Sequence, residues 1–273
     1  MSNTAFSNVR KDATKFKAVI FDWAGTMIDF GSFAPMGVFV EVFSDFGLEV
    51  TIDEARAPMG MAKRDHIQEM LKQPRIAQLW LDVNGVPATT KDIDAIYAAF
   101  VPKNEEVVKK YATLVPGAAK MIAGLRARGL KIGSTTGYTR SIMANVLPLA
   151  AEQGYTPDSL VCSDDGFEGR PSPLGMYRSF VELGVYPPEA VIKVDDTTPG
   201  IGEGKAAGSI TVGVALSGNY VGKTSDELAV MSETEIAPLR AHASRKLFGA
   251  GADYIIDTVA DLPSLITRLE ASN

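Results

Sequence analysis

The chain has 273 residues, of which 46% are apolar and 22% charged, and its formal net charge is −6. This composition is ordinary for a globular protein and excludes a fibrous or disordered chain. The acidity argues against nucleic-acid partners and against anionic membrane surfaces. With one cysteine, Cys162, and two histidines, His66 and His242, the sequence excludes an internal disulfide and a zinc site of several ligands. A carboxylate site for a hard cation stays open.

Residues 1–15 are polar and lack the apolar core of a signal peptide, so we expect a disordered leader there. No stretch reaches the roughly 18 consecutive apolar residues that a membrane helix needs, so we expect no membrane partner. The single cysteine agrees with a reducing compartment, and we expect a cytoplasmic protein.

Short apolar runs typical of buried strands alternate along the chain with stretches typical of helices. The predicted strands cover residues 17–21, 130–133, 159–162, 191–194, 210–214 and 252–256, and helices are predicted over 116–128, 139–153, 173–183 and 200–207. This alternation predicts an α/β fold with a parallel sheet and right-handed crossovers. In such sheets the ligand lies beyond the carboxyl ends of the strands, so we expect the site there.

Residues 31–111 break the alternation, because they contain no clear buried strand. They predict helices over 35–46, 52–56, 61–81 and 90–110, and Thr51 and Glu54 have the spacing of a capping box. We therefore expect an α-helical cap domain at 31–111, inserted into a core domain made of 16–30 and 112–273. The stretch 221–248 predicts a mostly helical excursion at the periphery of the core.

Asp22 follows the first predicted strand directly, and Gly25 follows in a turn. A carboxylate fixed in this way can act as a nucleophile, or it can simply cap the next segment, and the local pattern does not distinguish the two. Candidate partners follow later strands.

The hydroxyl of Thr136 and the cation of Arg170 suit phosphoryl oxygens, and Asp195 and Asp196 suit Mg²⁺. Taken singly, Thr136 is also explained by turn chemistry, and Asp195 and Asp196 by a charged turn. For Arg170 taken alone, a surface arginine in a proline-rich loop is the better explanation.

The order Asp, Thr, Arg, acidic loop resembles the haloacid dehalogenase (HAD) superfamily over nearly the whole chain. The resemblance implies a Rossmann-like core with a mobile cap, and an aspartyl-phosphate intermediate at Asp22. It also implies Mg²⁺ held by Asp22, the main-chain carbonyl of Ala24 and Asp196. The metal loop departs from many relatives, which have glycine in place of Asp195 and an acidic residue in place of Gly200. We expect Asp195 to supply the missing negative charge through water.

Ala24 occupies the position where most phosphatases of that superfamily carry a second aspartate, which protonates the leaving alcohol. Alanine cannot act as an acid, so either the protein is inactive or its leaving group needs no acid there. A carbon leaving group fits, if an amine forms an iminium that takes up its electrons. Lys63 is the candidate amine and His66, one helical turn away, a candidate proton carrier. From their spacing alone, both are more often exposed surface residues.

Six strings together resemble the phosphonoacetaldehyde hydrolase (phosphonatase) family: residues 21–26, 29–35, 54–60, 63–66, 132–138 and 169–171. The resemblance implies that Lys63 forms a Schiff base with the aldehyde, that Asp22 takes the phosphoryl group, and that acetaldehyde leaves as an enamine. The positions that it places around the substrate are Met59, His66, Tyr138, Gly137 and Ser32.

The function that this resemblance implies is Mg²⁺-dependent hydrolysis of phosphonoacetaldehyde to acetaldehyde and phosphate. Such an enzyme serves the breakdown of 2-aminoethylphosphonate, after a transaminase has made the aldehyde, and the family suggests a homodimer joined through the caps. One alternative is a phosphate-ester phosphatase or phosphomutase, against which Ala24 argues. The other is a non-catalytic binding protein on the same fold.

Overall fold

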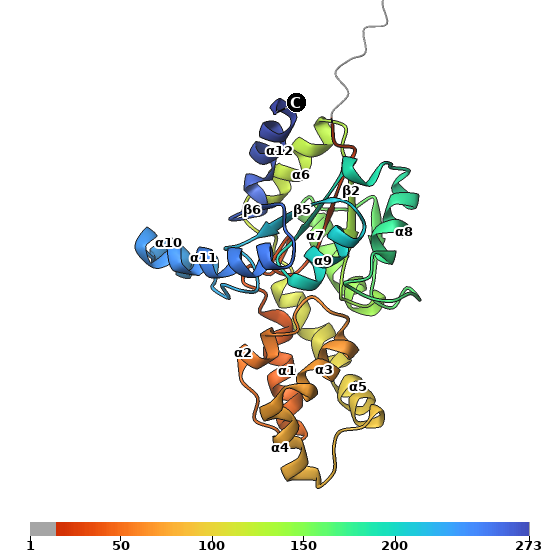
Figure 1. The fold of residues 1–273 in the computed structure, drawn as a ribbon, viewed down its shortest axis with the longest axis vertical. Helices are drawn as coiled ribbons and strands as arrows, with labels where there is room; N and C mark the ends of the chain where they lie inside the picture. Colours follow the sequence, from red (N-terminus) through yellow and green to blue (C-terminus); the bar gives the residue numbers. More distant parts are fainter. Residues whose placement is uncertain (1–14, 273) are drawn as a thin grey trace, which may run out of the picture.

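The computed structural model describes residues 15–272 and shows an α/β lobe with a smaller, purely helical lobe beneath it (Figure 1). The leader expected at 1–15 lies outside the described residues, apart from Lys15. The strands are β1 (Ala18–Phe21), β2 (Lys131–Thr135), β3 (Ser159–Val161), β4 (Val191–Asp195), β5 (Ile210–Val214) and β6 (Tyr254–Ile256). All six predicted strands are thereby confirmed, as is the α/β fold class.

The helical lobe contains α1 (Ala34–Asp45), α2 (Ile52–Arg56), α3 (Lys63–Lys72), α4 (Pro74–Asn84) and α5 (Thr90–Val107). The α/β lobe contains α6 (Ala118–Ala127), α7 (Arg140–Glu152), α8 (Leu174–Leu183), α9 (Thr198–Ala206), α10 (Ser225–Val230), α11 (Glu233–Gly249) and α12 (Leu262–Ala271). Short 3-10 helices cover Val108–Tyr111, Pro188–Ala190 and Val259–Asp261.

The sheet is parallel throughout, in the order β3-β2-β1-β4-β5-β6. Central β1 is buried on both faces, as its continuous apolar sequence predicts. Its side chains alternate: Val19 and Phe21 join the core that α6, α7 and α12 cover, whereas Ala18 and Ile20 pack with residues of α8. This two-sided burial fixes the tip of β1, where Asp22 begins the first loop of the candidate site.

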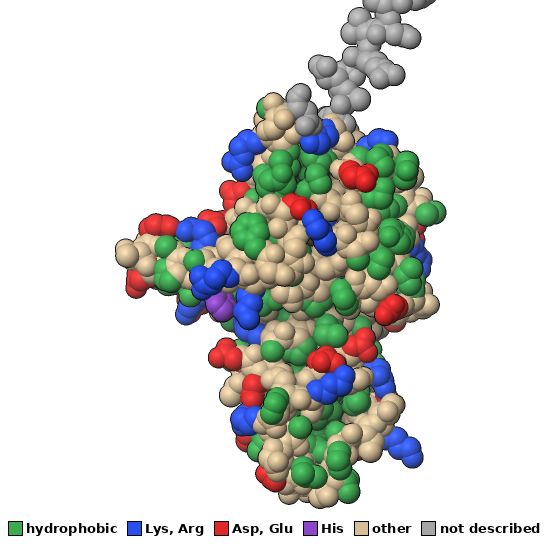
Figure 2. Space-filling view, viewed as in Figure 1, with side chains coloured by type: hydrophobic (Ala, Val, Ile, Leu, Met, Phe, Trp, Pro, Cys, Tyr) green, Lys and Arg blue, Asp and Glu red, His purple; other side chains and the backbone are tan. Residues whose placement is uncertain are grey.

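The helical lobe has its own hydrophobic cluster, which includes Phe39, Ile67, Trp80 and Phe100. Figure 2 shows that a narrow waist joins this lobe to the rest of the molecule. The capping box of Thr51 is confirmed, because its hydroxyl accepts from the backbone N–H of Glu54, whose side chain accepts from the N–H of Thr51.

The single helix predicted over 61–81 is wrong. The chain forms two helices here, α3 and α4, with Gln73 between them in an extended conformation (ψ 131°). The cause is Pro74, whose ring disfavours helical geometry at the residue before it and which suits the first position of a new helix. Ile76 and Trp80 of α4 reach the core of the lobe.

The stretch 221–248 forms α10 and most of α11, which project sideways from the sheet as the blue arm of Figure 1. The prediction of a mostly helical excursion is confirmed. Within residues 15–272, no helix combines the length and the apolar character that crossing a membrane requires.

The core of the helical lobe makes a stability prediction at Phe100, which is fully buried and stacks on Phe39 at 4.4 Å between ring centroids. Phe100→Ala leaves a cavity and is expected to lower the free energy of unfolding by about 3–5 kcal/mol. Ile52→Ala, at a position 54% exposed in the same lobe, is the control and should change it by no more than about 0.5 kcal/mol. Urea denaturation followed by circular dichroism measures both, and equal values for the two variants would contradict the packing described.

Candidate active site

The loops after β1, β2 and β4 bring three predicted residues to one edge of the sheet. Asp22 follows β1, Thr136 follows β2, and Asp196 follows β4. Because these three strands are neighbours, their carboxyl ends meet, as parallel sheets require. All three side chains are buried, and the edge faces the helical lobe (Figure 1).

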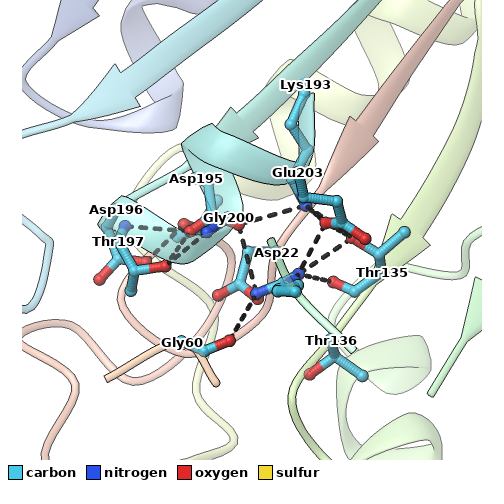
Figure 3. Close-up of polar contacts among 12 residues, drawn as sticks. Asp22, Gly60, Thr135, Thr136, Lys193, Asp195, Asp196, Thr197, Gly200 and Glu203 are labelled. Carbon is cyan, nitrogen blue, oxygen red and sulfur yellow. Dashed lines mark hydrogen bonds and ion pairs between the residues drawn. The ribbon is translucent and has the colours of Figure 1, made fainter. Parts of the chain in front are cut away.

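Arg170, from the loop before α8, ties these loops together. Its Nη1 donates to Asp22 Oδ1 at 2.8 Å, and its Nε donates to Glu203 Oε2 at 3.0 Å (Figure 3). Its Nη2 donates to the carbonyl and hydroxyl oxygens of Thr135. The side chain of Arg170 is 4% exposed, so it is a fixed cation beside Asp22 and not the surface arginine that its loop sequence allows.

Two further charged residues, Lys193 and Glu203, belong to this network, and the sequence motifs did not predict them. Lys193 lies wholly buried in β4, with Nζ 3.1 Å from Glu203 and 3.2 Å from Asp195, and donates to the hydroxyl of Thr135 at 2.6 Å. A lysine within an apolar strand is expected to be buried, and buried lysines almost always have charged partners. The sequence of β4 could therefore have predicted an acidic partner for Lys193. Glu203, on the buried face of α9, had no such signal, because only the fold shows that it faces Arg170.

Three carboxylates, those of Asp22, Asp195 and Asp196, offer oxygens within 4.8 Å of one another. Burial raises the pKa of Asp22 to about 6, with a further contribution from the charge of Asp195. Burial and the charges of Asp22 and Asp195 raise the pKa of Asp196 well above its usual value. A cluster that resists ionisation in this way fits a divalent cation, which would offset the repulsion with oxygen ligands.

Asp195 differs from its two neighbours. Burial alone would raise its pKa, but the charges of Arg170 and Lys193 outweigh burial and lower it. An ideal Cβ on Gly200 would lie 1.9 Å from Asp195 Oδ2, so the Asp195 carboxylate takes the space that a side chain at position 200 would need (Figure 3). Many relatives have glycine at position 195 and an acidic residue at position 200, whereas this chain has the reverse. The carboxylate of Asp195 occupies the space that an acidic side chain at position 200 would start from, so the two exchanges compensate for each other sterically.

Asp196 is held by Thr26 and Asn219. The hydroxyl of Thr26 donates to Oδ1 at 2.9 Å, and the backbone N–H of Asn219 donates to Oδ2 at 2.8 Å. A side chain on Gly25, which has φ +81°, would collide with the same carboxylate, so the loop after β1 needs glycine there. The first loop and the metal loop are thus built against each other.

Lys63 enters the site from the helical lobe, as the first residue of α3. It is 3% exposed, with Nζ 5.1 Å from the ring centroid of Tyr138, 5.7 Å from that of Phe39 and 4.0 Å from Met59 Sδ. Burial is the largest cause that lowers its pKa, to about 8, and Arg170 lowers it further, while Asp22 and Asp29 oppose the shift. The solvated lysine that the spacing alone allows is therefore not what the structure shows.

His66 is also buried, against Phe39, with ring centroids 4.0 Å apart. Burial and the charge of Lys63 hold its pKa well below the usual range, so the ring is neutral. Its Nε2 lies 2.8 Å from the carbonyl oxygen of Ala55, which can only accept, so the proton is on Nε2. Nδ1 then carries a lone pair and has no hydrogen-bond partner among the described residues.

A cavity of about 20 Å³ separates the two lobes at this point, enough for about one water molecule. Its lining consists of Asp22, Ala24, Met59, Gly60, Lys63, Thr136, Gly137, Tyr138, Arg170 and Thr197. Ser32, expected near the substrate, is not among them; it is buried at the junction of the lobes, with φ +55°.

The approach of the lobes depends on two glycines. A Cβ on Gly60 would lie 2.2 Å from the Thr197 hydroxyl, and one on Gly137 would lie 2.6 Å from the carbonyl oxygen of Met61. Neither contact is possible for a real Cβ, so any larger residue pushes the segment that carries Lys63 away from the strand tips.

The family model for haloacid dehalogenase-like hydrolases matches residues 16–208. The chain is 52% identical to phosphonoacetaldehyde hydrolase of Paraburkholderia xenovorans over 93% of its own length and 96% of the relative's. It is 46% identical to phosphonoacetaldehyde hydrolase of Klebsiella pneumoniae, over 94% and 96% of the two chains. The chain belongs to the phosphonoacetaldehyde hydrolase family. The protein is therefore a hydrolase of the HAD superfamily, as the motifs predict.

A solved structure shows the same arrangement. The crystal structure of a phosphonoacetaldehyde hydrolase-like protein from Oleispira antarctica matches with a TM-score of 0.92 at 45% identity, covering 95% of this chain and 94% of that one. The β-phosphoglucomutase of Clostridium difficile matches with a TM-score of 0.69 at 15% identity, covering 94% and 97% of the two chains. At that identity the likeness shows the fold alone.

The carboxylate cluster predicts a divalent-cation site that depends on Asp196. Asp196→Asn removes one carboxylate from the cluster. Losing a hydrogen-bond partner of a metal ligand lowers metal affinity roughly 10- to 100-fold, so losing a ligand itself is expected to lower the affinity for Mn²⁺ by at least that much. Electron paramagnetic resonance of free Mn²⁺ in a titration measures this. Asp226→Asn, at an exposed position in α10, is the control. Unchanged Mn²⁺ affinity in Asp196→Asn would contradict the site.

Proposed function

We propose that the chain hydrolyses the carbon–phosphorus bond of phosphonoacetaldehyde to acetaldehyde and phosphate. The relatives at 46–52% identity carry this name, and the family resemblance covers both lobes. The observation that carries the proposal is the buried amine of Lys63, with its pKa near 8, in the same small cavity as the Asp22 carboxylate. Because its pKa is lowered to about 8, a much larger share of this amine is neutral near pH 8 than for an ordinary lysine. The neutral form can condense with an aldehyde, and the carboxylate can accept a phosphoryl group.

The steps follow from these two groups. Lys63 Nζ attacks the aldehyde carbon, water leaves, and a protonated Schiff base forms. Asp22 then attacks phosphorus, and the electrons of the breaking carbon–phosphorus bond pass into the iminium, giving an enamine. Protonation of the enamine and addition of water release acetaldehyde from Lys63, while a second water hydrolyses the aspartyl-phosphate to phosphate and regenerates Asp22.

Ala24 favours this reaction over phosphate-ester hydrolysis or phosphomutase chemistry. It lines the cavity beside Asp22 and offers no proton for an oxygen leaving group. The iminium supplies what an acid would otherwise supply, because it takes up the electrons of the leaving carbon. A non-catalytic role on this fold is the weaker alternative, since the family consists of hydrolases.

The phosphoryl group is proposed to bind between Thr136 and Arg170, whose fixed charge suits the developing negative charge on its oxygens. Asp22, the carbonyl of Ala24 and Asp196 are proposed to hold Mg²⁺, with Asp195 adding negative charge from the next shell. When bound, Mg²⁺ supplies charge neutralisation for the transferring phosphoryl oxygens. The raised pKa values of Asp22 and Asp196 support a cation there.

The remaining predicted residues are proposed to serve the lysine. Neutral His66 has a lone pair on Nδ1 with which to take up a proton, as the Schiff base steps require. Met59, Tyr138 and Gly137 are proposed to enclose the aldehyde, since all three line the cavity. For Ser32 the structure supports a role at the junction of the lobes more than a contact with substrate.

We further propose that 31–111 is a cap domain that opens and closes over a core of 16–30 and 112–273, because the cavity is too small for entry in the closed state.

A homodimer joined through the caps is also proposed. The exposed apolar side chains of Val83 and Val86 at the end of the helical lobe support it. From the family resemblance we also propose a place in 2-aminoethylphosphonate breakdown in the cytoplasm, after a transaminase has made the aldehyde.

The proposed reaction predicts the effect of Lys63→Arg. Guanidinium stays protonated and cannot form an imine, so kcat for phosphonoacetaldehyde is expected to fall by more than the roughly 10²- to 10³-fold that losing one transition-state donor costs. Acetaldehyde is measured with a coupled alcohol dehydrogenase and phosphate with molybdate. Lys72→Arg, at the exposed end of the same helix, is the control and should keep wild-type rates. Phosphate release from sugar phosphates, with none from phosphonoacetaldehyde, would favour the phosphatase alternative.

The lowered pKa of Lys63 predicts a pH dependence. Below pH 8 the amine is protonated and cannot attack, so kcat/KM should rise with pH and level off above about pH 8. Arg170 and burial lower this pKa while Asp22 and Asp29 raise it, so a cation that neutralises Asp22 moves the rise to lower pH. Steady-state kinetics between pH 6 and pH 10 measure it, and a rise that continues to the ordinary lysine value near 10.5 would refute a buried, neutral amine.

A further inference from the structure

Arg56, the last residue of α2, reaches from the helical lobe across the waist to the α/β lobe. Its Nη1 lies 3.1 Å from both the carbonyl oxygen and the side-chain oxygen of Asn219. The same nitrogen lies 2.9 Å from the carbonyl oxygen of Gly31, in the segment where the chain passes between the lobes. One cation thus joins the cap, the connecting segment and a core loop.

Asn219 faces Arg56 on one side and the metal loop on the other. Its Nδ2 donates to the carbonyl oxygen of Arg56 at 3.3 Å, so the side-chain amide and the cap are bonded in both directions. Its backbone N–H donates to Asp196 Oδ2 at 2.8 Å. Through these hydrogen bonds, Asn219 bridges the cap and a carboxylate of the proposed cation site. The bridge is shielded from water, because Asn219 is 2% exposed.

The guanidinium of Arg56 fits this place closely. It lies over the ring of Phe33, with Cζ 5.3 Å from the ring centroid. A Cβ on Gly222, which has φ +57°, would lie 3.0 Å from Cζ, so the core loop leaves the space that the guanidinium fills. The oxygens of Gly31 and Asn219 all contact Nη1, while the planar guanidinium lies over the ring of Phe33; a lysine ammonium could supply the charge but not this stacked plane.

We propose that Arg56 and Asn219 are positioning residues that clamp the segment carrying Lys63 onto the metal loop. The inference rests on the proposed role of Lys63. Arg56 lies seven residues before Lys63, and between them Gly60 packs against Thr197 of that loop. The clamp holds the start of this segment, the glycine contact holds its middle, and Lys63 at its end is thereby kept in the cavity.

The clamp acts on the chemistry through the pKa of Lys63. Burial lowers that pKa, and burial exists only while the cap stays closed. Without the clamp, water reaches the amine more often, and its pKa moves from about 8 back toward the ordinary value of 10.5. Release of the clamp should therefore expose Lys63 even in the absence of substrate.

The test measures how fast acetic anhydride labels Lys63 in the full-length protein without substrate, by peptide mass spectrometry. It is run close to the ordinary lysine pKa of 10.5, where an exposed amine is also partly neutral, so that the rate reports access to Lys63. Arg56→Met removes the donors, and Asn219→Ala removes the side-chain amide but keeps the backbone N–H that binds Asp196. Each is expected to raise the labelling rate about 10- to 100-fold, the size of a lost charged hydrogen bond. The double variant should add little to either single variant, because both break the same contact.

Three further variants bracket the effect. Arg75→Met is the matched control, because the hydrogen bonds of Arg75 within residues 15–272 go to Glu49 and Glu54 of the helical lobe. Gly137→Ala should label fast, because a Cβ there pushes the lobes apart without touching the clamp. Arg56→Lys keeps the charge and should recover part of the protection. Melting curves by circular dichroism show whether each variant is folded, and if Arg56→Met fails to fold, Asn219→Ala and Arg56→Lys decide.

Wild-type labelling of Lys63 in folded Asn219→Ala or Arg56→Met would overturn the clamp. That outcome is separable from failure of the proposed function, because labelling needs no turnover. If the clamp holds but the protein does not cleave phosphonoacetaldehyde, labelling still rises in the clamp variants. If both hold, kcat/KM falls in the clamp variants in proportion to the loss of protection, and in Arg75→Met it does not.

Discussion

Repulsion among three buried carboxylates is the constraint on which the site depends. Asp22, Asp195 and Asp196 converge because β1 and β4 are neighbours whose carboxyl ends meet. Arg170 and Lys193 balance Asp195, whose pKa stays low, but they leave Asp22 and Asp196 with raised pKa values. The negative charges are therefore only partly neutralised by the protein. Arg170 and Lys193 lie on the side of Asp195, whereas the carboxylates of Asp22 and Asp196 are left for a divalent cation.

The same burial acts on Lys63 with the opposite sign. A lysine loses charge when it leaves water, whereas a carboxylate gains a proton. In the proposed closing of the cap, one movement would lower the pKa of Lys63 and leave a cavity with room for about one water molecule. This explains why the amine comes from a separate lobe: an amine fixed on the core beside Asp22, open to water, would stay protonated and pair with the carboxylate.

Much of the fold could be predicted because it follows from local patterns. The strand runs, the helical insertion and the order of Asp22, Thr136, Arg170 and Asp196 are visible in the sequence. The break between α3 and α4 was also visible at Pro74, but the apolar periodicity of residues 61–81 continues across it and concealed the change of direction.

What could not be predicted depends on contacts between distant segments. Nothing near Glu203 shows that it faces Arg170, and nothing near Asn219 shows that it bridges Arg56 and Asp196. The offset between Asp195 and Gly200 is likewise spatial, since it arises where α9 packs over the tip of β4. The spacing of Lys63 and His66 also predicted an exposed lysine, whereas Lys63 is buried. The first residue of a helix is normally exposed, and Lys63 is buried because the other lobe covers it.

The central claim is that a neutral, buried Lys63 forms an imine over Asp22. It is tested most directly by treating the protein with phosphonoacetaldehyde and borohydride, then mapping the reduced adduct by peptide mass spectrometry. The account predicts one adduct, on Lys63, with loss of activity in step with labelling. Absence of an adduct, or an adduct on a different lysine, would contradict it.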